Sequence, residues 1–453
     1  MTPTASRIAT PSPLPGLPSE RRPGRDRSQR SAAPAYYTMA SSLPRSHATH
    51  RMNVVKQIRQ FNAGRDPEPL AVKYRAMRSD PFVFLRATCH LFYARLPDAS
   101  VMRNAPPAWC SGDLHLENFG SYKGDDDQVY FDINDFDEAL LAPATWDLVR
   151  CLSSILVGRH HLQPGAGSNA QAVRLCEVFL ERYGRALIDG KARWVEREIA
   201  PSPVRELLED VHRRERGAFL DTRTVKRGRR RLIRIDGQRA LAATKQQRAQ
   251  VLELFGGLAA RPAEPRFFEV LDVARRVAGT GSLGLERLCV LVRGKGSPDG
   301  NFLLDLKQAP ALAVRARAPL AQPKWRDDAT RIVRVQERMQ AVSMALLQPV
   351  KLGDRPCVLR VLQPSEDRLD MVASRHPAAR LENIAAIAGK CVAWAQLRSS
   401  GREGSANADD LMAFAAGATW QRKLIALARH CADQVESDWK VFAQACDDAA
   451  FAP

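Results

Sequence analysis

Residues 112–118 read Gly-Asp-Leu-His-Leu-Glu-Asn, and residues 132–138 read Asp-Ile-Asn-Asp-Phe-Asp-Glu. A short apolar run, Ala108–Cys110, leads into the first block, and another, Val129–Ile133, leads into the second. Both runs are typical of short strands, and the turn residues Gly124–Asp127 lie between them. Carboxylates on loops just beyond short strands are well placed to face a cleft. We therefore expect the two blocks to form the functional site.

The acids of the second block lie close together, at positions 132, 135, 137 and 138. They would repel one another unless a cation or a basic ligand neutralised them. Magnesium takes oxygen ligands from one or two carboxylates plus phosphates, and Asn118 with Asp135 suits that need. Asp113 is then free to orient an attacking hydroxyl or to accept its proton. The alternative is a pair of acidic turns with solvated side chains.

The two blocks resemble the catalytic loop and the metal-binding aspartate of protein kinases and of aminoglycoside or choline phosphotransferases. In the small-molecule branch the loop runs Gly-Asp-Leu-His-x-x-Asn, which residues 112–118 reproduce. Residues 135–139 resemble that branch's Asp-Phe-Asp-Asp-Ala, and Trp146-Asp147-Leu148 resembles the start of the helix whose aspartate ties down the catalytic loop. The resemblance implies an α+β fold of the two-lobed protein kinase-like type, with a helix-rich C-lobe.

The same resemblance assigns a role to each matching residue. It makes Asp113 the catalytic residue and Asp147 a structural one. It makes Asn118 and Asp135 magnesium ligands, with Asp137 as a second metal ligand. The expected cofactors are therefore ATP, as the phosphoryl donor, and magnesium.

A second group of residues points to the nucleotide. Residues 279–284, Gly-Thr-Gly-Ser-Leu-Gly, precede two β-type runs, Leu288–Val292 and Phe302–Leu306, that a turn joins into a hairpin. A glycine-rich turn lets backbone N–H groups approach phosphates, and a lysine on a following strand can pair with them. A plain hairpin connection is the competing interpretation. The residues expected to bind the nucleotide are Gly279, Gly281, Ser282, Gly284 and Lys307.

In kinases an acid on the next helix holds the lysine. Glu337 is available for this on a helix predicted over Asp327–Leu347, and Gln336 or Gln340 could serve instead. The other helical patterns cover Val54–Leu96 (with a new element opening at Pro81), Trp146–His161, Ala170–Ile188, Val204–Arg216, Leu241–Leu258 and Ala379–Ala449, and one more strand covers Cys357–Leu362.

The order of these parts is unusual. In kinases the glycine loop and the lysine precede the catalytic loop, whereas here Gly279 and Lys307 follow Asp113. If both assignments hold, the arrangement is circularly permuted, with the small β lobe late in the chain. The expected parts are a disordered basic Pro/Ser/Arg-rich tail (1–50), a helical lobe with the catalytic and metal loops (51–265), a small β-rich nucleotide-binding lobe (266–365) and a C-terminal helical part (366–453).

From about Leu43 to its C-terminus, the chain also resembles an uncharacterised, mostly bacterial family, domain of unknown function 2252. That family name supplies no reaction. The chain departs from the family's usual His-Ala-Arg near Ala395–Arg398, which makes reduced activity or a nucleotide-binding pseudoenzyme conceivable. The matching pieces are Pro44–Ala48, Ser79–Arg86, Gly112–Gly120, Phe131–Glu138, Gly279–Gly284, Lys307 and Arg331–Gln340.

Composition sets broad limits on the protein. A net charge of +18 favours polyanions of any kind, which fits nucleotides and an anionic acceptor. No stretch approaches the roughly 20 apolar residues that span a bilayer. The nine cysteines are scattered singly, which argues against a disulfide framework and against a zinc ribbon, so we expect a reduced, cytoplasmic protein. An over-extended start, with Met39 or Met52 as the true one, is an alternative explanation of the tail.

The favoured function is a magnesium-dependent phosphotransferase that uses ATP on an unknown acceptor, and adenylyl transfer stays open. A metal-dependent phosphoesterase could use Asp113 and His115, although we expect His115 to pack the loop rather than to act as a base. A non-catalytic protein could instead bind nucleotide, or could bind nucleic acid through the basic run Arg223–Arg239. That run lacks interleaved aromatic residues, so nucleic acid is not the expected partner, and a solvated loop or hairpin is the simpler interpretation.

Overall fold

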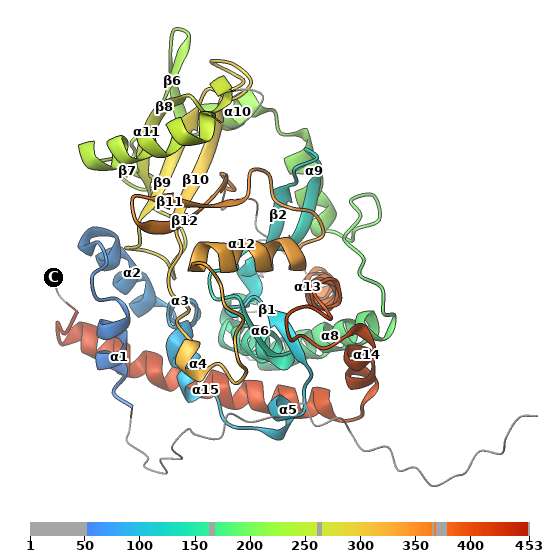
Figure 1. The fold of residues 1–453 in the computed structure, drawn as a ribbon. Coiled ribbons are helices and arrows are strands. Elements are labelled where there is room, and N and C mark those ends of the chain that lie inside the picture. The colour runs from blue at the N-terminus through green and yellow to red at the C-terminus, as the bar shows by residue number, and fades with distance from the viewer. Residues whose placement is uncertain (1–51, 163–167, 261–264, 365–366, 368–377, 452–453) are drawn as a thin grey trace, which may run out of the picture. The chain divides into compact units, whose positions relative to one another are not determined.

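A computed structural model describes residues 52–162, 168–260, 265–364, 367 and 378–451. The tail predicted for residues 1–50 and the family-like segment 44–48 lie outside these ranges. The described residues combine helices with antiparallel sheets, which confirms the α+β class (Figure 1). Among them, no helix is both long enough and apolar enough to cross a bilayer.

The elements have the following bounds. The helices are α1 Val54–Phe61, α2 Pro67–Ser79, α3 Pro81–Ala87, α4 Cys89–Arg95, α5 Ser100–Arg103, α6 Thr145–Val157, α7 Arg159–Leu162, α8 Ser168–Ile188, α9 Val204–Arg213, α10 Arg216–Asp221, α11 Lys245–Ala259, α12 Asp328–Met339, α13 Ala378–Arg398, α14 Ala408–Ala416 and α15 Trp420–Asp447. The strands are β1 Pro107–Cys110, β2 Phe119–Lys123, β3 Val129–Ile133, β4 Leu140–Pro143, β5 Thr224–Arg227, β6 Arg230–Ile233, β7 Ala240–Ala242, β8 Val270–Arg276, β9 Arg287–Val292, β10 Phe302–Gln308, β11 Gln348–Leu352 and β12 Arg355–Val361.

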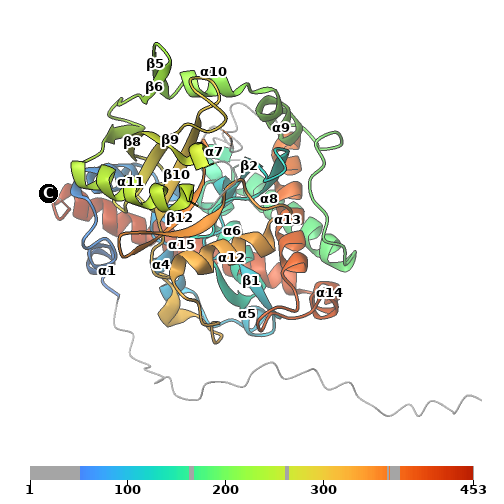
Figure 2. The ribbon, with the colours of Figure 1, turned by 45° about the horizontal axis from the view of Figure 1, so that its top comes forward.

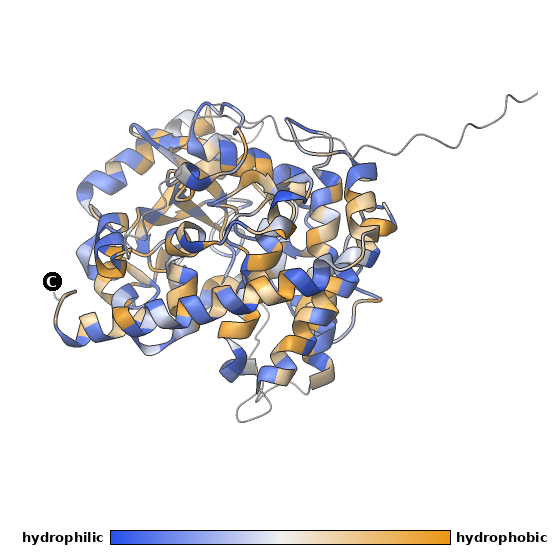
Figure 3. Ribbon diagram, turned by 90° about the horizontal axis from the view of Figure 1, so that it is seen from below, coloured by the Kyte–Doolittle hydropathy of each residue, from blue (hydrophilic) through white to orange (hydrophobic). Residues whose placement is uncertain are grey.

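Helix α6 is the centre of the helical part and is buried along its whole length. It packs against α8 from the same half of the chain and against α15 from the C-terminal end, while α13 packs on α8 (Figures 1 and 2). The surface helices mix hydrophobic and hydrophilic residues around their circumference, as expected for helices buried on one side (Figure 3). Segments from both halves of the sequence therefore share one hydrophobic core.

Two Asp-Pro steps start the helices that lead toward the site. Asp66 caps α2 by accepting from the Glu68 N–H, and Asp80 caps α3 by accepting from the Phe82 N–H. Proline follows each cap at the first helical position, where its missing N–H costs no hydrogen bond. These steps explain why a new element opens at Pro81, as the sequence predicted.

A six-stranded antiparallel sheet in the order β11-β12-β10-β9-β8-β7 forms the other main part. Helix α11 covers one face of it through Val251 and Phe255, which pack with Leu304 and Leu306 of β10. Helix α12 contacts β11, β12 and α13 and lies between the sheet and the helical part (Figure 1). Because side chains alternate along a strand, Asp305 of β10 lies on the face away from α11.

Several predicted boundaries were wrong, for local reasons. The helix predicted over Asp327–Leu347 ends at Met339, because Ser343 and Ala345 form backbone hydrogen bonds with the β2–β3 hairpin. The predicted start at Leu241 lies in β7, and α11 begins only after a capping box at Thr244. The helix from Trp146 breaks at Gly158. Strands β2, β4, β7, β8 and β11 were not predicted as strands.

The basic run forms a hairpin, β5–β6, in agreement with the simpler interpretation of the sequence. Its base is held by Arg231, whose buried guanidinium donates to Asp221, to Thr224 and to Asp299. Most of the other charged side chains in the run are exposed to solvent.

Candidate active site

A cavity of about 350 Å³ lies where the two sequence blocks, the glycine-rich turn and the N-terminal helices meet. Its volume is within the range typical of small-molecule sites. All the predicted site residues line it except Lys307, which pairs with the lining residue Asp137. The predicted residues in the lining are Asp113, Asn118, Asp135, Asp137, Gly279, Gly281, Ser282 and Gly284. The cavity therefore brings together residues that lie far apart in the sequence.

The first block is fixed by the start of α6. The carboxylate of Asp147 accepts from the backbone N–H groups of Ser111, at 2.7 Å, and Gly112, at 2.9 Å. Burial raises the pKa of Asp147 to about 6, while these N–H donors act to lower it. Gly112 has φ +84°, and a Cβ there would lie 1.9 Å from the Glu138 carbonyl oxygen. Only glycine lets the two blocks approach this closely.

Asp113 points into the cavity and is held by Arg150, which lies one helical turn after Asp147 on α6. The Nε and Nη2 atoms of Arg150 lie 2.9 and 2.7 Å from Asp113 Oδ1. Burial raises the pKa of Asp113, while the Arg150 charge acts to lower it. Because Arg150 engages Oδ1, the orientation of this carboxylate is fixed. The sequence prediction missed Arg150, although its spacing from Asp147 puts both on one side of the helix.

Asn118 lies at the far end of the same loop. Its side-chain amide donates to the backbone oxygen of Asp113 at 2.8 Å. This bond directs the amide nitrogen toward the loop, and the side-chain oxygen Oδ1 is the atom left to accept from, or coordinate, a ligand. Asn118 can therefore hold the loop and act as an oxygen ligand at the same time.

Lys307 pairs with the second block rather than with α12. Its ammonium group forms an ion pair with Asp137 and lies 3.9 Å from Asp135. Glu337 instead pairs with Arg334 at the surface, and Gln340 donates to the Ile133 carbonyl oxygen. The prediction that an acid or amide of α12 holds Lys307 was therefore wrong.

Helix α12 contributes to the site in a different way. The buried Arg331 donates to the backbone oxygens of Ala139 and Asp137, at 2.8 and 2.9 Å. Together with Gln340, it fixes the backbone of the second block. The family-like piece Arg331–Gln340, far from the blocks in sequence, therefore contacts the second block in the fold.

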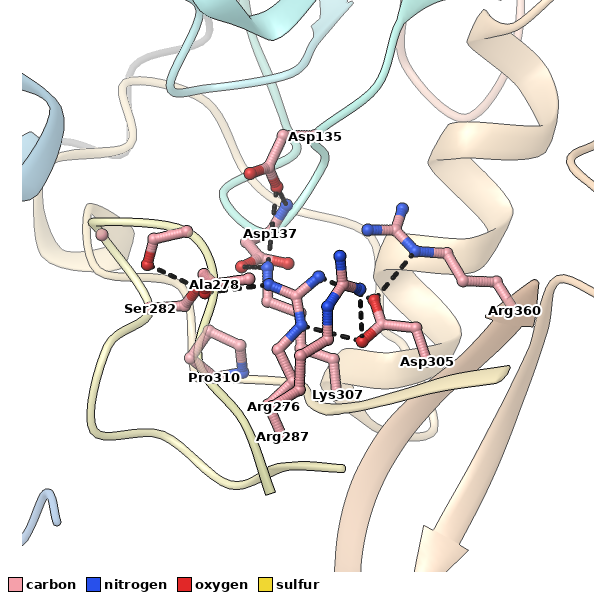
Figure 4. A network of polar contacts seen from close by, with 12 residues as sticks. Asp135, Asp137, Arg276, Ala278, Ser282, Arg287, Asp305, Lys307, Pro310 and Arg360 are labelled. Carbon is pink, nitrogen blue, oxygen red and sulfur yellow. Dashed lines mark hydrogen bonds and ion pairs between the residues drawn. The ribbon is translucent and has the colours of Figure 1, made fainter. Parts of the chain in front are cut away.

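Beside Lys307, a cluster of arginines surrounds Asp305 (Figure 4). Asp305 lies 2.9 Å from Arg276, 2.7 Å from Arg287 and 3.6 Å from Arg360. Burial acts to raise the pKa of Asp305, but the guanidinium groups hold it well below its usual range. Arg287 also donates to the Ala278 carbonyl oxygen, at the start of the glycine-rich turn. Three arginines against one carboxylate leave an excess of positive charge beside this turn.

The glycine-rich turn is held from outside by the segment between α1 and α2 and by Lys73 of α2. Arg65 donates to the Gly281 and Leu283 carbonyl oxygens, at 2.8 and 3.0 Å, and Lys73 donates to Gly281 at 3.0 Å. The Asp66 N–H donates to the Gly284 carbonyl oxygen. In the described part of the chain, the Gly281 N–H has no backbone acceptor. The Ser282 N–H donates within the turn, to the Gly279 carbonyl oxygen, whereas the Gly281 N–H stays available for an anion.

Two further groups, Glu138 and His115, lie at the site. Burial raises the pKa of Glu138 to about 8, and its Oε2 accepts from the Ala313 N–H. His115 accepts from the Glu117 N–H through Nδ1 and packs edge-on against Phe82. These contacts agree with the expectation that His115 packs the loop.

Beside the cavity, His90 stacks on the lining residue Phe61, and its protonation should affect the stability of the fold in acid. His90 stacks on Phe61 with ring centroids 3.9 Å apart, and both its ring nitrogens are buried with no hydrogen-bond partner among the described residues. Burial, helped by the charges of Lys73 and Arg65, lowers the pKa of His90 to about 3. The folded state thus binds fewer protons than the unfolded state between about pH 6.5 and pH 3, so stability falls as the pH falls.

His90→Phe should therefore gain stability over the wild type in acid, by up to about 1.4 kcal/mol per pH unit below about pH 6. The stacked ring is kept, so little change is expected at pH 7.5. Urea unfolding at pH 7.5 and pH 5 measures the difference, with the exposed His160→Gln as the control. An equal difference at both pH values would show that His90 does not charge on unfolding.

The sequence profile of one family, described as an uncharacterized protein conserved in bacteria (DUF2252), matches residues 65–445. The chain belongs to DUF2252. The match spans every residue that lines the cavity except those at the end of α1 and just after it. No curated protein and no solved structure matches the chain.

DUF2252 membership does not decide among the reactions considered above. A two-metal phosphoesterase centre needs several histidine and carboxylate ligands gathered in one place. Among the described residues, no group of three or more His, Cys, Asp or Glu side chains could hold a metal ion. A magnesium site of two carboxylates, one amide oxygen and donor phosphates needs no such group.

Proposed function

We propose that this DUF2252 protein is a magnesium-dependent phosphotransferase with ATP as the donor. The observation that carries the proposal is the single cavity lined by Asp113, Asn118, Asp135 and the glycine-rich turn. Phosphoryl transfer needs few covalent partners from the protein, because positioning and charge stabilisation supply most of the catalysis. A carboxylate for the acceptor, oxygen ligands for the metal and backbone donors for phosphates are the parts it requires.

The arrangement around the sheet supports a circularly permuted, kinase-like version of this chemistry. In protein kinases a glycine-rich loop joins the first two strands, a lysine lies on the third, and a helix follows. Here the turn 279–284 joins β8 to β9, Lys307 lies on β10, and α12 comes next along the chain. The difference is the lysine's partner, since Asp137 takes the place of a helix acid.

The second block suits a cation. Asp135 and Asp137 already share the ammonium group of Lys307, and Asn118 adds an amide oxygen at the same cavity. A magnesium ion held by these three residues would neutralise charge on the donor phosphates. Lys307 and the N–H groups of the turn would then bind the phosphates themselves.

In the transfer step, the acceptor hydroxyl oxygen bonds to the γ-phosphorus as the bond from that phosphorus to the β,γ-bridging oxygen breaks. ADP leaves, and the hydroxyl proton passes to Asp113. Burial raises the pKa of this carboxyl group, which suits a proton acceptor, and Arg150 fixes its direction. Asp147 holds the loop that carries it.

The test is to incubate the purified protein with magnesium and ATP and to identify the products by chromatography. Magnesium-dependent formation of ADP, as slow hydrolysis or as transfer to an added extract of small metabolites, supports the proposal. Formation of AMP and pyrophosphate would replace phosphoryl transfer with adenylyl transfer. No nucleotide product under any condition, from a protein that is folded by circular dichroism, would contradict both.

A further inference from the structure

Arg86 occupies a position in the cavity that the proposed chemistry does not yet use. It lies near the end of α3, and its Nη1 pairs with Glu117 Oε2 of the first block at 2.7 Å. The side chain of Arg86 is 12% exposed and that of Glu117 is 34% exposed. The Nε atom of Arg86 is buried and has no hydrogen-bond partner among the described residues. A guanidinium group that lines the cavity is suited to an oxyanion.

The surroundings of Arg86 place it on the acceptor side of the cavity. The carbonyl oxygen of its neighbour Leu85 accepts from Arg150, the residue that orients Asp113. Two residues beyond Ala87, Cys89 contacts the Gly112 carbonyl oxygen through its thiol at 3.7 Å. Arg86 is therefore next to the catalytic loop, and its backbone also contacts the tip of the glycine-rich turn.

Close packing and hydrogen bonds hold the cavity wall beside Arg86 in place. A Cβ at Gly281 would lie 3.3 Å from the Arg86 carbonyl oxygen, so the tip of the glycine-rich turn packs directly on α3. The fully buried Lys73 joins the same turn to Asn62, with Nζ 2.9 Å from the Asn62 side-chain oxygen. A small molecule fits within the existing cavity.

We propose that the acceptor is a small molecule that carries an oxyanion, a carboxylate or a phosphate, beside the hydroxyl that reacts, and that Arg86 binds this oxyanion. The inference rests on the proposed phosphotransfer reaction for its hydroxyl, but the anion site itself does not depend on it. Without acceptor, Glu117 pairs with Arg86. When the oxyanion binds to Arg86, the partly exposed Glu117 side chain rotates into solvent. Arg86 thereby positions the acceptor, and Asp113 remains the group that meets the hydroxyl.

The two members of the pair should affect anion binding in opposite directions. The probe is inorganic phosphate, titrated by calorimetry at constant ionic strength, with the donor site filled by magnesium and a non-hydrolysable ATP analogue. Arg86→Gln should weaken phosphate binding about 10-fold or more, because a charge-assisted bond is lost. Glu117→Gln should tighten it several-fold, because the competing carboxylate is gone. The surface variant Arg334→Gln should match the wild type.

Acetate in place of phosphate separates the two sources of the oxyanion. Tighter binding of one probe, with the same dependence on Arg86, identifies a carboxylate or a phosphate on the acceptor. Phosphate binding that is unchanged in both Arg86→Gln and Glu117→Gln would overturn the proposal. So would an Arg86→Gln variant that loses the ATP analogue but keeps phosphate, because Arg86 would then bind the donor.

The same titrations keep this inference apart from the proposed function. If the wild type binds no ATP analogue, the proposed function fails, and the phosphate titration is then run without nucleotide. Opposite effects of Arg86→Gln and Glu117→Gln in that experiment would still establish the anion site.

Discussion

Asp113→Asn should lower ATP turnover by at least about 100-fold while nucleotide affinity stays within a factor of about three, because general-base catalysis and acceptor positioning contribute roughly 10²–10⁴-fold. Asparagine is preferred to alanine because Arg150 is fully buried against Asp113. Removing the carboxyl group altogether would leave that guanidinium group unpaired in the interior, at a cost of several kcal/mol. The asparagine oxygen can still accept one hydrogen bond from Arg150.

The matched control is Asp126→Asn, on the turn of the β2–β3 hairpin, where the carboxylate accepts from the Tyr130 hydroxyl and from the Gln128 N–H. This variant should turn over like the wild type. Steady-state rates, together with calorimetric titration of the ATP analogue, separate turnover from binding. If Asp113→Asn kept the wild-type rate, the assignment of Asp113 as the acceptor-orienting residue would be wrong.

Asp135→Ala should remove magnesium-dependent nucleotide binding, with a loss of affinity of about 100-fold or more, on the order of a lost charge-assisted contact or two. The fold should survive, because Asp137 still pairs with Lys307 and Arg331 still holds the backbone of the block. Binding without magnesium should be weak in both the wild type and the variant. Titration of ATP into the wild type and into the variant, each with magnesium or with excess chelator, measures the four affinities.

Asp125→Ala provides the control for Asp135→Ala. Asp125 lies in the turn of the β2–β3 hairpin, and its side chain accepts from the Leu346 N–H away from the cavity. It should bind magnesium and ATP normally. A variant at position 135 that binds magnesium and ATP as tightly as the wild type would contradict the metal assignment.

Much of the local structure followed from sequence patterns, because the signals were local. The apolar runs before the two blocks formed β1 and β3, and the Asp-Pro step at Pro81 opened α3. The convergence of the blocks with the glycine-rich turn was also expected, from a resemblance whose order along the chain is permuted. The roles assigned to these residues stay predictions until they are measured.

The contacts that the sequence did not reveal all depend on tertiary packing. Nothing local shows that Arg150 reaches Asp113, that Arg65 holds the glycine-rich turn, or that Lys307 prefers Asp137 to Glu337. The last choice was wrong because helical spacing predicts which face a side chain occupies but not which neighbour that face meets. Glu337 lies on the side of α12 that faces solvent, where Arg334 neutralises it.

The most direct measurement is thermal unfolding of the wild type and of Asp135→Ala with ATP, in the presence and absence of magnesium. A ligand at about 100 times its dissociation constant stabilises the folded state by roughly 2.7 kcal/mol, which raises Tm by a few degrees. The account predicts a magnesium-dependent rise in the wild type that Asp135→Ala loses. No rise with ATP, alongside a rise with manganese or zinc alone, would contradict it and would favour a metal-dependent phosphoesterase.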